Sequence, residues 1–292
     1  MTILVTGGTG TVGSQVVARL AAVGEDTRVL TRSPEKAAAL PEGVTGAVGA
    51  LSKPATLRPA FEGADRLFLL TPLAQDEVDQ GLAAIEAAKA AGVDRIVFMS
   101  VHQADQAPRI PHFASKVEIA RRLEGSGIPY TVIEPNSFYQ NDLWFQQPLM
   151  GFGVYPNPLG SVGLNRVDVR DIADAVVTAL TEDGHAGEHY PVVGPGVSTG
   201  EGSAQAWAAA LGSGVIYAGD DLDAWARAVS AMMPEWLVED LRIMFEHFQE
   251  HGLLASDDDF ARQRRILGRD PTPFARFATE VAAMWKTQAA GA

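Results

Sequence analysis

Short, almost wholly apolar runs alternate with amphipathic stretches through the first half of this chain, and this alternation constrains the fold more than any other feature. Strands that are apolar on both faces belong in parallel sheets covered by helices. The predicted strands are TILVTG at residues 2–7, TRVLTR at 27–32, DRLFLLT at 65–71, DRIVFMS at 94–100 and YTVIEP at 130–135. The stretches between them have helical spacing, and several end in glycine. This pattern predicts an α/β fold with a doubly wound parallel sheet.

The character of the sequence changes after about Phe138. Residues 139–160 are rich in aromatic, amide, proline and glycine residues, which predicts an irregular segment that lines a site. A helix over 167–180 and a strand over 189–194 follow, and from Gly200 the chain is predicted to be mostly helical. We expect a Rossmann domain over residues 1–155, with the segment of about 166–194 returning to it. A smaller, mostly helical C-terminal lobe is expected over residues 156–292.

Composition excludes several classes of chemistry. The 292 residues contain no cysteine, so disulfides, thiol nucleophiles, cysteine zinc sites and iron–sulfur clusters are all absent. The net charge of −13 and the lack of a basic stripe argue against nucleic acid as a partner. MTILVTGG lacks the basic region of a signal peptide, and no apolar run reaches the ~20 residues that cross a bilayer. We therefore expect a cytoplasmic protein with no membrane partner.

A glycine-rich loop, TGGTGTVG at residues 6–13, joins the first predicted strand directly to a helix. It contains GxGxxG as Gly8, Gly10 and Gly13, and GxxGxxG as Gly7, Gly10 and Gly13. In this context glycines permit a tight turn and a close backbone approach to a pyrophosphate, while the helix N-terminus presents free N–H groups. The loop predicts a dinucleotide site. The alternative is an ordinary strand–turn–helix corner.

The end of the second strand indicates which dinucleotide binds. An NAD site usually carries an acid here, bonded to the ribose hydroxyls. This strand ends at Arg32, while Glu25 and Asp26 lie at its opposite end. An arginine pairs with a 2′-phosphate, and Ser33 and Lys36 are placed to assist. We predict NADP(H) over NAD(H); the alternative for Arg32 is a solvated surface arginine.

Five further stretches of the chain, taken with the glycine loop, carry a family resemblance. The stretches are TRSPEKA at 31–37, AAKAAGVDRIVFMS at 87–100, HFASKVEIARRLEGSGIPYTVIEPNSFYQN at 112–141, VDVRDIADAVVTAL at 167–180 and ILGRDPTPFARFATE at 266–280. With them the chain resembles the NmrA-like group of atypical short-chain dehydrogenases/reductases, and most of all the NADPH-dependent quinone, azo-dye and triphenylmethane-dye reductases in that group. The resemblance covers almost the whole chain, and it is the order of the motifs that is specific.

This resemblance implies roles for individual residues. Arg32 matches the arginine that binds the 2′-phosphate, Ser100 stands where the family often has its catalytic serine, and Lys116 matches the lysine that bonds the nicotinamide ribose. The residues that match the pyrophosphate loop are Gly7, Gly10, Thr11, Val12 and Gly13. Those expected beside the rest of the cofactor are Thr71, Pro72, Ser100, Pro135, Asn136, Ser137 and Phe138.

The chain departs from the classical pattern at the proton donor. None of its five tyrosines has a lysine four residues later, and His112 occupies that position before Lys116. A neutral imidazole beside an ammonium is a poor acid at neutral pH, which argues against His112 as a simple replacement for the tyrosine. Two roles remain open for His112: a catalytic partner of Lys116, or a packing residue. Hydride transfer to a conjugated acceptor gives a delocalised anion that collects its proton from water. Such a reaction needs no strong general acid.

The aromatic segment after the predicted strand at 130–135 suits a flat, apolar acceptor such as a quinone or a dye. Phe138, Tyr139 and Trp144 are the predicted substrate contacts, and core packing is the alternative for each. HFQEH at residues 247–251 has the histidine spacing of some zinc peptidases, but the glycine that follows indicates the last turn of a packing helix. We expect no metal.

Two functions remain in competition at this point. The first is an NADPH-dependent reductase, with Lys116, His112 and Ser100 as catalytic candidates. The second is a non-catalytic NADP(H)-sensing regulator that acts through a protein partner, which the missing tyrosine favours. A homodimer is left open.

Overall fold

The structure is a computed structural model that describes residues 1–290, and it divides into two compact units. The sheet unit comprises Met1–Pro135, Val169–Val192 and Arg262–Gly268. The helical unit comprises Asn136–Asp168, Val193–Ala261 and the chain from Arg269 onward. The boundary between functional domains predicted near residue 155 stays a prediction.

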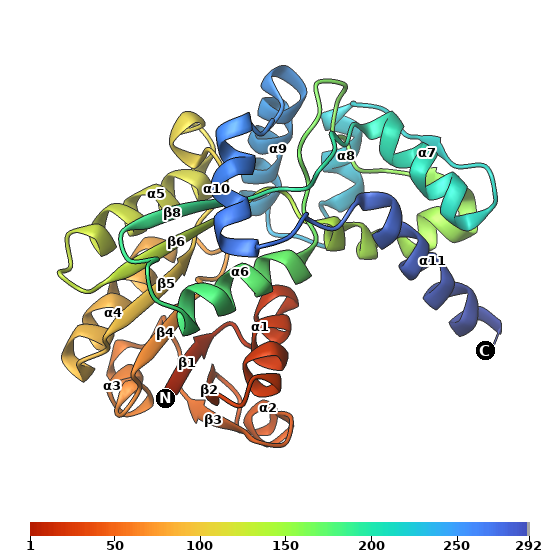
Figure 1. Cartoon of the computed structure of the whole chain (residues 1–292). Coiled ribbons are helices and arrows are strands. Elements are labelled where there is room, and N and C mark those ends of the chain that lie inside the picture. Colours follow the sequence, from red (N-terminus) through yellow and green to blue (C-terminus); the bar gives the residue numbers. More distant parts are fainter. Residues whose placement is uncertain (291–292) are drawn as a thin grey trace. The chain divides into compact units, whose positions relative to one another are not determined.

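Seven parallel strands form the sheet unit, in the order β3-β2-β1-β4-β5-β6-β8 (Figure 1). Apolar side chains on both faces explain why these segments form central strands: β1, β4 and β5 are buried almost throughout. The strands are β1 (Thr2–Thr6), β2 (Asp26–Thr31), β3 (Val44–Val48), β4 (Arg66–Leu69), β5 (Arg95–Met99), β6 (Tyr130–Pro135) and β8 (Glu188–Val192). The predicted doubly wound Rossmann fold is confirmed.

Helices cover both faces of this sheet. α1 packs beside α6 on one face, and α4 packs between α3 and α5 on the other. The helices of the sheet unit are α1 (Thr11–Ala22), α2 (Pro34–Ala38), α3 (Leu57–Phe61), α4 (Glu77–Ala91), α5 (Pro111–Glu124) and α6 (Val169–Thr181), with 3₁₀ turns η1 (Pro54–Thr56) and η2 (Ala104–Gln106). A core built from Leu4, Leu67, Phe61, Ile119 and Val132 lies between the sheet and the α3–α5 layer.

The strand order reverses between β1 and β4, and a side chain joins the two strands at that point. Their backbone pairing ends at Val5 and Phe68. Beyond it, the Thr6 hydroxyl donates to the carbonyl of Leu70 at 2.9 Å and accepts the Leu70 N–H at 2.7 Å. Ligands of open α/β sheets bind outside the carboxyl ends of the strands at such a switch point. The topology therefore places the candidate site beyond β1 and β4.

The helical unit begins with irregular backbone, as the composition of residues 139–160 predicts. A 3₁₀ segment and a π-helical turn precede a two-stranded sheet of β7 and β9, and helices complete the unit. Its core is aromatic: Trp207 stacks on Trp285 with ring centroids 5.1 Å apart. The elements are η3 (Tyr139–Phe145), η4 (Pro148–Phe152), β7 (Val154–Tyr155), α7 (Gly200–Leu211), β9 (Ile216–Tyr217), α8 (Leu222–Val229), α9 (Glu235–His251), α10 (Asp257–Leu267, shared with the sheet unit from Arg262) and α11 (Phe274–Ala290).

Candidate functional site

The glycine loop turns from β1 into α1 in a way that only glycine permits at two positions. Gly7 has φ +65°, a left-handed conformation that residues with a Cβ rarely adopt. A Cβ on Gly13 would lie 2.2 Å from the carbonyl oxygen of Gly7, far inside van der Waals contact. The backbone of the helix start therefore packs directly against the backbone of the turn.

The exposed side of the same loop is shaped to accept an anion. Gly10 and Thr11 are exposed, whereas Val12 is buried beneath them. Gly10 caps α1 without a side-chain hydrogen bond, so no protein side chain occupies the cap position. Free N–H groups and the positive end of the helix dipole at such a terminus favour a phosphate. The arrangement fits the pyrophosphate of a dinucleotide.

Arg32 follows the last residue of β2 and lies exposed, with no hydrogen bond or ion pair to any residue between 1 and 290. Ser33 caps α2 by accepting the N–H of Lys36 at 3.2 Å, and its hydroxyl donates to the carboxylate of Glu35. That hydrogen bond holds the pKa of Glu35 below its usual range. The Ser33 proton is therefore already engaged, which leaves Arg32 as the group free to meet a 2′-phosphate.

A buried polar triangle lies where β4 gives way to α4. The Thr71 hydroxyl donates to Oε1 of Glu77 at 2.6 Å, and Nζ of Lys116 lies 2.7 Å from both oxygens. The relative exposure of Glu77 is 1%, of Thr71 4% and of Lys116 7%. Lys116 also lies over the ring of Phe98, 5.6 Å from its centroid. Pro72, next to this triangle, is exposed.

The predicted catalytic residues of the sheet unit occupy different environments. Ser100 follows β5 and is buried, and its N–H donates to the carbonyl of Ile133 at 2.8 Å. His112 is half-buried in the first turn of α5, with its ring edge-on to Phe113. Gln103, in the loop between them, adopts φ 54°, an uncommon conformation for a residue other than glycine. Uncommon backbone conformations of this kind cluster at functional sites.

The predicted cofactor residues after β6 cross from one unit to the other. Pro135 ends β6 in the sheet unit, and the helical unit starts at Asn136. The buried Asn136 donates to the carbonyl of Leu253 at 2.8 Å, and its side-chain oxygen accepts the N–H of Ser137. Phe138 is half-buried. These contacts fix the backbone of the segment, and its place against the cofactor stays a prediction.

Tyr139 and Trp144, the other predicted substrate contacts, lie in opposite environments. Tyr139 is 1% exposed, packs against Phe274 and Phe277, and donates its hydroxyl to the carbonyl of Thr272 at 3.3 Å. It is a packing residue of the helical unit here, and its contact with an acceptor stays a prediction. Trp144 is 86% exposed on η3.

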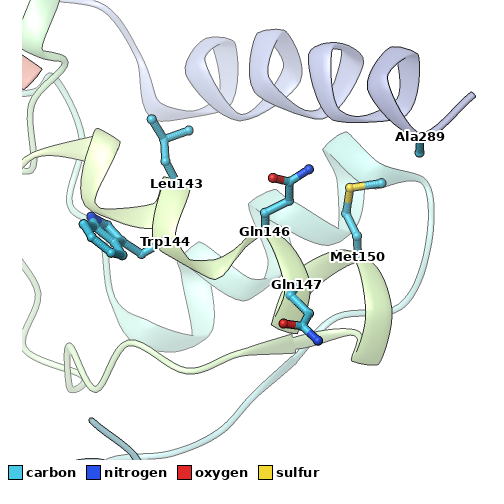
Figure 2. A pocket seen from close by; sticks show the side chains of 6 residues that line it. All are labelled: Leu143, Trp144, Gln146, Gln147, Met150 and Ala289. Atoms are coloured by element: carbon cyan, nitrogen blue, oxygen red, sulfur yellow. The ribbon is translucent and has the colours of Figure 1, made fainter. Parts of the chain in front are cut away.

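An open, largely apolar depression lies beside Trp144 (Figure 2). Its walls come from η3, η4 and the end of α11, and the side chains of Leu143, Gln146 and Met150 point toward α11. The lining residues are Leu143, Trp144, Gln146, Gln147, Met150 and Ala289. The lining offers a flat apolar molecule aromatic and thioether surface together with two amides.

A fully buried ion pair, not anticipated from the sequence, holds the helical unit together below this surface. Arg166 and Asp142 are 0% exposed and lie 2.6 Å apart at their closest atoms. Tyr155 donates to Asp142 at 3.1 Å, and the indole of Trp207 donates to the same carboxylate at 2.9 Å. Burial raises the pKa of Tyr155, so its hydroxyl stays neutral. This network fixes η3, the segment that carries Trp144.

The histidines of the HFQEH motif lie on α9, as the helical spacing predicts. The rings of His247 and His251 are 5.0 Å apart, and burial followed by the charge of His251 lowers the pKa of His247. Within residues 1–290, no three His, Cys, Asp or Glu side chains converge as metal ligands. Over the same residues, no helix combines the length and the apolar character that crossing a membrane requires.

The parallel sheet, the switch point beyond β1 and the glycine loop together define a dinucleotide-binding protein of the Rossmann class. The chain belongs to the NmrA-like family, whose family model matches residues 1–278. The resemblance read from the sequence is therefore confirmed.

Two curated relatives span nearly the whole chain. An NAD(P)H azoreductase of Xenophilus azovorans is 36% identical over 96% of this chain and 98% of its own. A (4-alkanoyl-5-oxo-2,5-dihydrofuran-3-yl)methyl phosphate reductase of Streptomyces griseus is 33% identical over 95% of this chain and 97% of its own. Among solved structures, the Escherichia coli NADPH-dependent quinone oxidoreductase QOR2 complexed with NADPH is 26% identical. It superimposes with a TM-score of 0.85 over 96% of this chain and 99% of its own.

Proposed function

We propose that this protein transfers hydride from NADPH to a flat, conjugated, electron-poor acceptor such as a quinone or an azo or triphenylmethane dye. The protein is an NADPH-dependent reductase of the NmrA-like family. The observation that carries the proposal is the match to an NAD(P)H azoreductase over 96% of this chain, because a match of that length extends over both units. The match to a structure of NADPH-bound quinone oxidoreductase QOR2 supports the same choice of cofactor.

Residues of the sheet unit fit NADPH in three places. The glycine loop and the start of α1 suit the pyrophosphate, since Gly10 and Gly13 allow backbone contact without a Cβ. Arg32 supplies an unpaired guanidinium for the 2′-phosphate. Lys116 retains one N–H beyond those that point to Thr71 and Glu77, and this donor suits a ribose hydroxyl. When bound, NADPH supplies the hydride.

The protein's own contribution to the reaction is orientation rather than acid catalysis. Hydride transfer to a quinone or an azo group leaves an anion that takes its proton from water, and hydride transfer to a cationic triphenylmethane dye gives a neutral product that needs no proton. His112 is half-buried, with its ring edge-on to that of Phe113, a position that suits packing as well as contact with a substrate. We infer that replacement of His112 by phenylalanine leaves most of the activity in place. Ser100 is a candidate hydrogen-bond donor to the acceptor.

The acceptor is proposed to lie against aromatic surface of the helical unit. Trp144 and Phe152 are the exposed aromatic residues of the segment, and Phe138 and Phe145 are half-buried. Trp144 lines a largely apolar depression together with two amide side chains, Gln146 and Gln147. Such a surface favours flat, weakly polar molecules over sugars or peptides. The relatives, which are reductases by name, support a small molecule as the partner.

Steady-state oxidation of NADPH with a panel of quinones, azo dyes and enones tests the proposal. We expect turnover with at least one conjugated acceptor and a marked preference for NADPH over NADH. Tight NADPH binding with no turnover on any acceptor would instead favour the regulatory alternative, in which the protein senses NADP(H) and acts through a protein partner. Gel filtration tests whether the protein forms a homodimer, which the sequence leaves open, and a nucleic-acid binding assay tests the expectation of no nucleic-acid partner.

A further inference from the structure

The buried triangle of Thr71, Glu77 and Lys116 contains an acid that no motif in the sequence points to. Glu77 accepts from the Thr71 hydroxyl and pairs with the Lys116 ammonium through the same oxygen, Oε1. Its second oxygen, Oε2, is buried and has no hydrogen-bond partner among residues 1–290. A buried carboxylate in this state needs an explanation, since buried polar atoms are nearly always satisfied.

We propose that Glu77 is a positioning residue for cofactor binding: it fixes the ammonium of Lys116 so that one N–H donor remains for the nicotinamide ribose of NADPH. The inference rests on the proposed NADPH-dependent function. Lys116 is the residue that touches the cofactor, and Glu77 acts through it.

Hydrogen-bond accounting supports this role. An ammonium has three N–H donors and a threonine hydroxyl has one. Because the Thr71 proton is donated to Glu77, the Thr71 oxygen is left to accept from Lys116. Two of the three donors of Lys116 are thus directed at fixed oxygens, and the direction of the third follows from tetrahedral geometry. The side chain of a lysine is otherwise flexible, so this fixation removes freedom that a ligand would have to remove on binding.

The position of Glu77 on α4 explains why its carboxylate tolerates burial. Glu77 is the first residue of this fifteen-residue helix, where the helix dipole favours a negative charge. The carboxylate also neutralises an ammonium whose side chain is only 9% exposed. Without Glu77 the ammonium would be buried beside the ring of Phe98, with one hydroxyl as its partner. An unpaired charge in that environment is strongly disfavoured.

Fold stability alone does not account for this arrangement. A buried ion pair of two side chains contributes little net stability and is often replaced by apolar residues without loss. Here, in addition, one carboxylate oxygen lacks a partner. The network is therefore better explained by the orientation that it imposes on Lys116 than by the free energy that it adds to folding.

Glu77→Gln is the test variant, and Glu86→Gln is its matched control. Glu86 lies on the same helix and is exposed, so the control changes the same charge without touching the triangle. Dissociation constants are measured by fluorescence for NADPH and by calorimetry for adenosine 2′,5′-bisphosphate, which carries only the adenosine half of the cofactor. For Glu77→Gln we expect NADPH to bind about tenfold more weakly, the loss that follows from weakening one charge-assisted hydrogen bond. The affinity for the bisphosphate and both affinities of Glu86→Gln are expected to stay at the wild-type values.

The outcomes separate the possibilities. Equal loss for NADPH and the bisphosphate would mean that Glu77 only supports the fold, and no loss for either would also overturn the inference. The KM for NADPH is expected to rise while the KM for the acceptor does not, a split that general destabilisation would not produce. If wild-type protein binds no NADPH at all, the proposed function fails, and that result is distinct from normal wild-type binding with an unaffected variant.

A second comparison keeps the inference testable if Glu77→Gln folds poorly. Lys116→Met/Glu77→Leu removes both charges together and leaves no buried unpaired ion. Its affinity for NADPH is expected to equal that of Lys116→Met, because Glu77 has nothing left to position. A further tenfold loss in the double variant would show that Glu77 acts independently of Lys116 and would overturn the proposal.

Discussion

Substitution of alanine for Gly13 tests the cofactor loop most directly, because the structure gives the size of the clash. The new Cβ would lie 2.2 Å from the carbonyl oxygen of Gly7, 2.7 Å from its carbonyl carbon and 2.8 Å from Cα of Gly8. All three atoms belong to the backbone, so no side chain can rotate away. An ordinary carbon–oxygen contact is more than about 3 Å, and the start of α1 must therefore move by about 1 Å relative to the turn.

Two effects of this shift can be sized. Overpacking of this kind lowers the free energy of unfolding by about 1–3 kcal/mol. A displacement of about 1 Å in a positioning element costs on the order of 100-fold in function, so the affinity for NADPH should fall by a comparable factor. Both losses are expected together, since one backbone movement causes them.

Gly10→Ala provides the comparison within the same loop. The φ angle of Gly10 is −90°, which alanine adopts freely, and its Cβ would meet only the Gly7 oxygen, at 3.3 Å. The free energy of unfolding is therefore expected to change by less than about 0.5 kcal/mol. NADPH affinity should still fall, because the new methyl group stands on the exposed side of the loop, where the phosphates approach.

Urea unfolding gives the stabilities, and titration of NADPH fluorescence gives the affinities. If Gly13→Ala unfolds at the wild-type urea concentration and binds NADPH as tightly as the wild type, the proposed contact between helix start and turn is wrong. If Gly10→Ala leaves NADPH binding unchanged, the loop does not approach the pyrophosphate.

Three further predictions concern other parts of the molecule. Arg32→Ala should weaken NADPH binding by about 10- to 100-fold and leave NADH binding unchanged, since a charge-assisted hydrogen bond contributes about 1.5–3 kcal/mol; equal wild-type affinities for the two cofactors would refute the assignment. Asp142→Asn should lower the free energy of unfolding by about 3–5 kcal/mol in urea denaturation, because it leaves Arg166 as an uncompensated buried charge; an unchanged midpoint would contradict this reasoning. The hydrogen bond to Glu134 raises the pKa of His189 in the folded protein. The protonated His189 should therefore stabilise the fold fully below about pH 6.5, and this stabilisation should be lost as the pH rises through the folded pKa. In thermal melts, the melting temperature of His189→Gln should depend less on pH than that of the wild type.

Much of the sheet unit follows from local pattern. The apolar runs that end at Thr6, Leu69 and Met99 form buried parallel strands, since a parallel sheet with helices on both faces buries both faces of such a run. The glycine loop was equally predictable from the sequence, because Gly7 and Gly13 are required by the backbone geometry of a turn only a few residues long. These features depend only on residues that are close together in the chain, so a single sequence is enough to predict them.

The groups that side chains form across elements were not predictable in the same way. Glu77 has the sequence context of an ordinary acid at a helix N-terminus, and nothing nearby identifies Lys116 as its partner, 39 positions along the chain. No motif in the sequence points to Asp142 and Arg166 either, although they form a fully buried ion pair inside the helical unit. Asp142 could have been predicted as a structural residue only if its burial had been known in advance.

The aromatic segment shows the same limit. Its composition predicted an irregular stretch, which the structure confirms, but composition does not distinguish a packed ring from an exposed one. Tyr139 lies in the core and Trp144 at the surface, five positions apart. The amino-acid sequence by itself determined six of the seven strands of the parallel sheet, the turn and the family. The tertiary structure alone decided which polar groups meet and which rings face outward, because burial and long-range contact depend on how distant segments pack.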